Sequence, residues 1–243
     1  MSGSGQAEGR ARIAAPTRRL VGWSPADLRR WPGRTAAALH TGPAGADPAT
    51  PADADPMAGP GPSDHWDGLL AYVAVNRSWI DGVVVDGPDP AGDPDLTSLL
   101  AALAEAGIPT RLITHGMHPG VLAHAVAEQL VVSVSLDVPT VPGRLAELVG
   151  RADAPQRLRA SVAVLVNGGV DHDFRTSVRS GAVALDELPS LAENLRGGRL
   201  YALEPGQRAD APEGEDAVVD LVALRAAARA CCASLPTIVR DAG

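Results

Sequence analysis

The stretch GVVVDGPDP, Gly82–Pro90, decides the fold class of this chain. Its three consecutive valines are typical of a short buried strand, and the glycine and prolines that follow favour a turn. A helical pattern with an expected end at Gly107 comes next, at 95–106. A strand, a turn and a helix in this order indicate half of a parallel strand–helix–strand unit.

The same alternation extends through most of the chain. We expect the other strands at residues 35–39, 110–114, 131–137, 172–178 and 199–203. We expect the other helices at residues 64–76, 119–130, 143–149, 155–167, 185–195 and 217–233, with Ser63 or Asp64 as the first N-cap. The run SVAVLV within 155–167 also fits a strand by propensity. Six strands alternating with helices predict an α/β fold, an incomplete (β/α)6 TIM-like barrel with parallel strands and a C-terminal helix.

Three segments follow from composition. Residues 1–19 are predicted to be a disordered tail, 20–205 the barrel, and 206–243 a linker and the C-terminal helix. Residues 20–32 are expected to pack as an extended cap or hairpin arm. The segment 40–62 is rich in proline, glycine, alanine and aspartate, so we expect a long loop that is poorly ordered or packs only by its ends.

Charge and cysteine content exclude several classes of function. The net charge is −8, which argues against general nucleic-acid binding. All 21 basic residues are arginines, which excludes a lysine Schiff base or a P-loop lysine. The two cysteines, Cys231 and Cys232, are adjacent, and we expect free thiols in a reducing compartment. No signal peptide or membrane span is predicted, so the expected location is the cytoplasm.

In parallel α/β folds, functional residues gather at the carboxyl ends of the strands. The expected strand ends carry polar side chains throughout. They are His40, Thr41, Asp86, Asp89, Thr114, His115, His118, Asp137, Arg175, Thr176, Ser177 and Glu204.

Four of these segments, in order, resemble the radical S-adenosylmethionine (SAM) activating enzymes. They are DGVVVDGPDP, RLITHG, VSVSLDVPT and VDHDFRTSV. The branch they are most similar to contains the anaerobic ribonucleoside-triphosphate reductase activating proteins, with the pyruvate formate-lyase activating enzymes nearby. The resemblance covers residues 21–203 and implies a partial barrel of the radical SAM type.

The resemblance also implies where SAM would bind. Asp86–Pro90 stands in place of a Gly-Gly-Glu-Pro turn, and Ile113–Gly116 in place of Asp-Thr-Asn-Gly. Asp137 is kept but the lysine two residues later is lost, whereas Phe174–Thr176 keeps the family's Phe-Arg-Thr. The cofactor-binding residues that this implies are Asp86, Gly87, Asp89, Thr114, Gly116, Asp137, Arg175 and Thr176.

The family's cluster motif is missing. The resemblance places Cys-x3-Cys-x2-Cys after the first strand, but residues 41–56 contain no cysteine. Aspartates in this loop are hard ligands, unsuited to a low-potential cluster. We therefore expect no [4Fe–4S] cluster, no catalytic residue and at most weak SAM binding. The hypothesis is a non-catalytic binding or regulatory pseudoenzyme, with a glycyl-radical enzyme or another protein as its partner.

Other interpretations stay open from the residues alone. Arg175 either binds an anion or pairs with Asp137 or Asp173. His115 and His118 could form a zinc, iron or manganese site with neighbouring carboxylates, which would make the protein a metal-dependent hydrolase. An activating enzyme with atypical cluster ligation is the remaining alternative.

Overall fold

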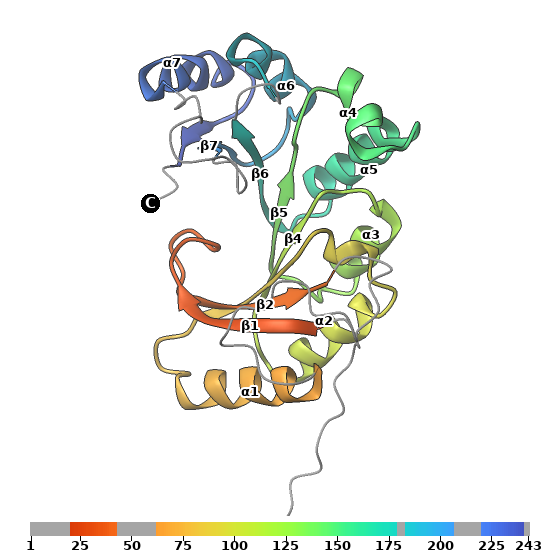
Figure 1. Cartoon of the computed structure of the whole chain (residues 1–243), viewed down its shortest axis with the longest axis vertical. Helices are drawn as coiled ribbons and strands as arrows, with labels where there is room; N and C mark the ends of the chain where they lie inside the picture. The colour runs from red at the N-terminus through yellow and green to blue at the C-terminus, as the bar shows by residue number, and fades with distance from the viewer. Residues whose placement is uncertain (1–19, 43–61, 179–182, 207–219, 241–243) are drawn as a thin grey trace, which may run out of the picture.

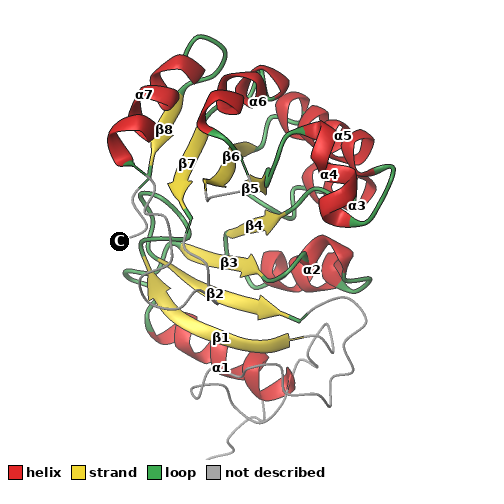
Figure 2. Cartoon of the chain, turned by 45° about the horizontal axis from the view of Figure 1, so that its top comes forward, coloured by secondary structure: helices red, strands yellow, loops and turns green. Residues whose placement is uncertain are grey.

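The computed structural model of the chain describes residues 20–42, 62–178, 183–206 and 220–240. Their strands form one eight-stranded sheet whose spatial order follows the sequence from β1 to β8. The sheet curves into an open barrel, with helices along its convex side (Figures 1 and 2). It is not closed, because among the described residues β1 and β8 are the two unpaired edges.

The eight strands are short, which suits a strongly curved sheet. They are β1 Leu20–Asp27, β2 Ala36–Thr41, β3 Gly82–Asp86, β4 Thr110–Thr114, β5 Ser133–Asp137, β6 Asp171–Val178, β7 Tyr201–Pro205 and β8 Thr237–Val239. The α-helices are α1 Pro62–Val75, α2 Leu96–Glu105, α3 Pro119–Ala127, α4 Pro142–Val149, α5 Ala154–Asn167, α6 Leu188–Asn194 and α7 Leu221–Cys231. Two 3-10 turns, η1 Pro90–Gly92 and η2 Leu185–Glu187, precede α2 and α6.

The strand directions confirm the predicted fold class. Strands β2 to β8 are parallel, and they include all six predicted strands. The arm expected at 20–32 contains β1, which pairs antiparallel with β2. The edge strand β8 was not predicted, because three residues after a proline give too short an apolar run.

Two local expectations differ from the structure. Helix α1 begins at Pro62, so Ser63 and Asp64 lie in its first turn and neither is the N-cap; proline suits this position because it needs no hydrogen bond there. The run SVAVLV is helical, as part of α5. Leu158, Val162 and Leu165 recur at helical spacing and are buried, which accounts for the helix.

The two faces of the sheet differ in chemistry. The convex face forms the main apolar core with the helices and includes Leu39, Val85 and Leu136. The concave face of β2 to β4 carries a smaller apolar cluster, in which Trp31 covers Ala36, Ala38, Val84 and Ile113. Alternate residues of a strand face opposite sides of the sheet. On β5 to β7, the residues that face the concave side are mostly polar.

Several expectations concern residues outside the described ranges. These are the tail at 1–19, most of the loop at 40–62 and much of the linker after 206. The division into three segments therefore stays a prediction. In the part of the chain that the structure describes, no helix is long and apolar enough to cross a membrane.

Candidate functional site

The predicted mouth of the barrel is present at one edge of the sheet. Strands β3 to β6 are mutually parallel, so Asp86, Thr114, Asp137 and Arg175 lie at a common carboxyl edge. Asp137 and Arg175 are direct neighbours across β5 and β6. Ligands bind at this edge in related open α/β sheets.

Arg175 is paired with Asp137. Its Nε donates to Oδ1 at 2.6 Å and its Nη2 donates to Oδ2 at 2.8 Å, a bidentate geometry. Burial alone would lower the pKa of Arg175, but the hydrogen bonds and charge of Asp137 raise that pKa above its ordinary value. Of the interpretations left open by the sequence, pairing with Asp137 is thus the one observed.

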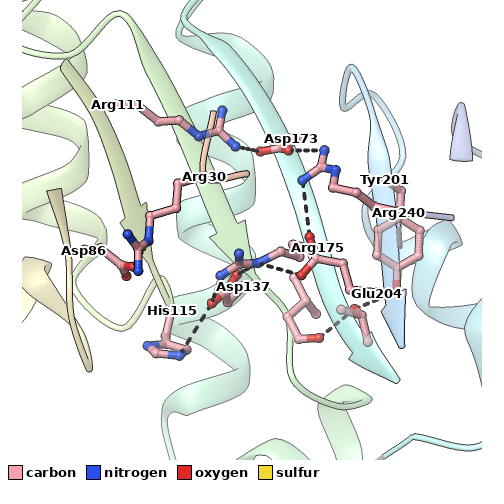
Figure 3. A network of polar contacts seen from close by, with 12 residues as sticks. Arg30, Asp86, Arg111, His115, Asp137, Asp173, Arg175, Tyr201, Glu204 and Arg240 are labelled. Atoms are coloured by element: carbon pink, nitrogen blue, oxygen red, sulfur yellow. Dashed lines mark hydrogen bonds and ion pairs between the residues drawn. The ribbon is translucent and has the colours of Figure 1, made fainter. Parts of the chain in front are cut away.

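The ion pair belongs to a chain of charges along the concave face (Figure 3). Asp173 accepts hydrogen bonds from Arg111 at 2.6 Å and from Arg240 at 3.0 Å. Arg240 also donates to Glu204 at 3.3 Å, and Glu204 lies 3.8 Å from Arg175. Three arginines therefore alternate with three carboxylates, and their formal charges cancel.

Burial and neighbouring charges shift the pKa values of Asp173 and Glu204 in opposite directions. Burial would raise the pKa of Asp173, but Arg111 and Arg240 lower it below its ordinary value. For Glu204, burial prevails over Arg175 and Arg240, so its pKa is raised. The inner face is consequently a low-dielectric region in which the ion pairs are strongly coupled.

Three members of this site were not predicted from the sequence, namely Arg30, Arg111 and Arg240. The signal for Arg111 is its place within the apolar strand TRLIT, where a buried arginine needs a carboxylate on a neighbouring strand. No local signal exists for Arg30 and Arg240, which come from the segments after β1 and β8. Their approach to Asp86 and Asp173 depends on tertiary structure alone.

The turn after β3 is held against the end of β2. Asp86 accepts a hydrogen bond from the Gly87 amide at 2.7 Å and lies 3.4 Å from Arg30. Gly87 has a φ of 152°, and a Cβ there would lie 2.4 Å from the Thr41 carbonyl oxygen. The turn therefore requires glycine at this position.

Three further predicted residues share one hydrogen-bond network, which joins the turn after β3 to the turn after β4. Asp89 Oδ1 accepts from Thr114 Oγ1 at 2.8 Å, and Thr114 Oγ1 accepts from the Gly116 amide at 3.1 Å. Gly116 has a φ of 74°, which favours glycine. The structure thus brings Asp89, Thr114 and Gly116 together.

Thr176 lies on the opposite face of β6 from Arg175. Its hydroxyl donates to the Val138 carbonyl and contacts the Tyr201 hydroxyl, each at 2.7 Å, and the residue is fully buried. Burial raises the pKa of Tyr201 above its ordinary value. Any contact of Thr176 with a ligand at the mouth would use its backbone.

The two histidines of the β4–α3 turn each face a carboxylate. His115 Nε2 lies 3.8 Å from Asp137 and His118 Nε2 lies 4.0 Å from Asp89, both too long for hydrogen bonds. Within the described residues, no group of three or more His, Cys, Asp or Glu side chains could hold a metal ion. The structure therefore gives no support to the metal site considered from sequence.

Both cysteines are free and belong to the end of α7. Cys231 is buried on the helical side of the sheet and Cys232 is exposed. Burial raises the pKa of Cys231 to about 11. This donor set does not fit a [4Fe–4S] cluster at the mouth, because Asp137 and Arg175 of the mouth lie on the opposite, concave face.

Comparison with known proteins finds a relative in sequence. No protein-family model matches the chain. A Methanocaldococcus jannaschii protein, named as a glycyl-radical enzyme activating enzyme, is 22% identical over 146 residues. The match covers 58% of this chain and 61% of that protein, so the chain spans about three-fifths of this relative.

Solved structures share the fold. A radical SAM methyltransferase from Sphaerobacter thermophilus superposes with a TM-score of 0.61 at 14% identity, covering 87% of this chain and 67% of that one. Streptococcus suis SuiB gives a TM-score of 0.52 at 15% identity, covering 72% and 42%. The resemblance to radical SAM activating enzymes is confirmed as a relationship in sequence and in fold.

Proposed function

We propose that this chain is a non-catalytic binding or regulatory protein built on the scaffold of a radical SAM activating enzyme. The number and position of its cysteines carry the proposal. The family holds its cluster by three thiolates, whereas this sequence contains two cysteines in all. Both lie at the end of α7, Cys231 buried on the helical side of the sheet.

Other side chains are poor replacements for the missing thiolates. Residues 41–56 offer Asp47, Asp53 and Asp55, and carboxylates favour hard cations over an iron–sulfur cluster. Because the donors do not suit the cluster, we derive no radical chemistry for this chain.

The charge pairing at the mouth supports weak SAM binding at most. The carboxylate of SAM would have to compete with Asp137, which already occupies two donors of Arg175. Breaking a partly buried bidentate pair costs free energy that the ligand must supply. Asp86 is likewise engaged, by the Gly87 amide and Arg30.

The partner that we propose is a glycyl-radical enzyme, the class of protein for which the Methanocaldococcus relative is named. A protein that shares the fold of an activating enzyme but lacks its chemistry could bind such a partner and regulate it. The adjacent free thiols favour a reducing compartment, and we place the protein in the cytoplasm.

Anaerobic reconstitution with iron and sulfide tests the proposal. We expect no stoichiometric absorbance in the thiolate-to-iron charge-transfer region and no 5′-deoxyadenosine from SAM plus reductant. The double variant Cys231→Ser, Cys232→Ser is the matched control, since any iron bound adventitiously by these thiols disappears in it. A stoichiometric cluster together with release of 5′-deoxyadenosine by the unmodified protein would refute the proposal and favour an activating enzyme with atypical ligation.

A further inference from the structure

A cavity of about 310 Å³ opens at the carboxyl edge of the sheet, outside the chain of charges on the concave face. Its walls come from the turns after β3, β4 and β5 and from helix α4. Small-molecule sites occupy about 300–1,000 Å³, so this cavity suits a small ligand. Met117, His118, Leu145 and Val149 line it, and of the residues that the family resemblance implies, Asp89 alone lines this cavity.

The β4–α3 turn that forms one wall is held from behind. Ser161 donates to the Gly116 carbonyl at 2.7 Å, and Arg157 donates to the Met117 carbonyl at 3.1 Å. Both donors belong to α5, which packs beneath the turn. The side chains of His115, Met117 and His118 are therefore presented from a fixed backbone, which lowers the entropic cost of binding.

The apolar walls favour a flat ring. Met117, which is 6% exposed, presents thioether and carbon surface to the cavity, and Leu145, which has no exposed surface, packs behind this wall. Pro88 and Pro139 also line the cavity. A thioether and two pyrrolidine rings pack well against an aromatic face.

The polar end supplies one hydrogen-bond acceptor. Asp89 Oδ1 is engaged by Thr114, whereas Asp89 Oδ2 lies 4.0 Å from His118 Nε2, which is too long for a hydrogen bond. That oxygen can accept from a ligand N–H. Arg151, also at the cavity, is paired with Asp153 at 3.2 Å, so no cluster of free positive charge exists here to bind a polyphosphate.

We propose that this cavity binds a neutral, planar nitrogen heterocycle of one or two rings, whose amino group donates to Asp89. The ring lies between the apolar wall of α4 and the His115–His118 turn. This site does not depend on the proposed loss of cluster chemistry, and its test requires neither iron nor SAM.

Methionine methyl NMR tests occupancy directly. The chain has three methionines, and Met117 is the one within the described residues, so Met117→Leu assigns its signal after ¹³C-methyl labelling. We expect 2-aminopurine to shift this signal saturably through its ring current. Val149→Trp, which fills the cavity, should abolish the shift, while Leu148→Trp, at an exposed position of the same helix, should preserve it.

The role of Asp89 is tested by comparing the affinities of two purines. Purine, which lacks the amino group, should bind roughly 10-fold more weakly than 2-aminopurine, and Asp89→Asn should remove that difference. A Met117 signal unmoved by millimolar 2-aminopurine, or a shift that persists in Val149→Trp, would overturn the site. Equal affinity for the two purines in the unmodified protein would overturn the assignment of the ligand's amino group.

Discussion

Replacing Asp173 with asparagine should lower the free energy of unfolding by about 3–5 kcal/mol. Asp173 and Arg111 are buried together, with 7% and 4% of their side chains exposed, and their charged atoms lie 2.6 Å apart. Asparagine keeps the shape of the side chain but not its charge, so the Arg111 guanidinium is left buried without a counter-ion. Arg240 loses less, because it is 19% exposed and retains Glu204 at 3.3 Å.

Equilibrium urea unfolding followed by tryptophan fluorescence measures this loss. The matched control is Asp171→Asn on the same strand, since Asp171 is 62% exposed and its contacts with Arg199 and Ser133 are both long, at 3.5 Å. We expect no measurable change for the control. A loss below about 1 kcal/mol for Asp173→Asn would mean that Arg111 finds other solvation, and the argument from burial would be wrong.

The same variant has a defined pH dependence. Burial opposes ionisation of Asp173, but Arg111 and Arg240 hold its pKa below the ordinary value of 3.8. A lowered folded pKa gives stability that is fully present above the unfolded pKa and is lost as pH falls through the folded pKa. The difference in the free energy of unfolding between the unmodified protein and Asp173→Asn should therefore be constant above about pH 5 and shrink below about pH 4. A difference that grows in acid would contradict the assigned sign.

Two other measurements test local features. Gly116→Ala should cost about 1–3 kcal/mol, seen as a lower Tm, because φ is 74° and the new Cβ would lie 2.7 Å from Leu136. The control Gly120→Ala, in a position with no atom within 4 Å, should leave Tm unchanged or slightly raised, and equal losses in both variants would contradict the reasoning. At pH 8 a thiol reagent should modify Cys232 in the native protein, but Cys231 only after unfolding, since burial raises the pKa of Cys231 to about 11. Rapid reaction of two thiols in the native state would show that Cys231 is accessible.

Much of the fold was predictable because its signals are local. Runs such as GVVVD at Gly82–Asp86 and TRLIT at Thr110–Thr114 are short, apolar and bounded by turn residues, and each became a parallel strand. Parallel strands bring their carboxyl ends to one edge, so Asp86, Thr114, Asp137 and Arg175 could be placed at a common mouth in advance. The short edge strand β8 carried no comparable signal.

The partners within the site were not predictable in the same way. The family resemblance predicts Asp89, Thr114 and Gly116 as site residues, but only the structure shows that one hydrogen-bond network joins them across the turns after β3 and β4. The cavity beside them requires α4 to pack over these turns. Neither fact can be read from the spacing of residues along the chain.

From the sequence alone, the periodicity of apolar residues determined the class of fold, and the order of the strand-end motifs indicated the relationship to radical SAM activating enzymes. Tertiary structure decided which charges meet. Arg175 could have paired with Asp137 or Asp173, and the register of β5 against β6 places Asp137 directly beside it. Asp173 was left for Arg111 and Arg240, which are 62 and 67 residues away in the chain. Burial patterns act over a few residues, whereas an ion pair depends on the positions of strands that only the folded barrel brings together.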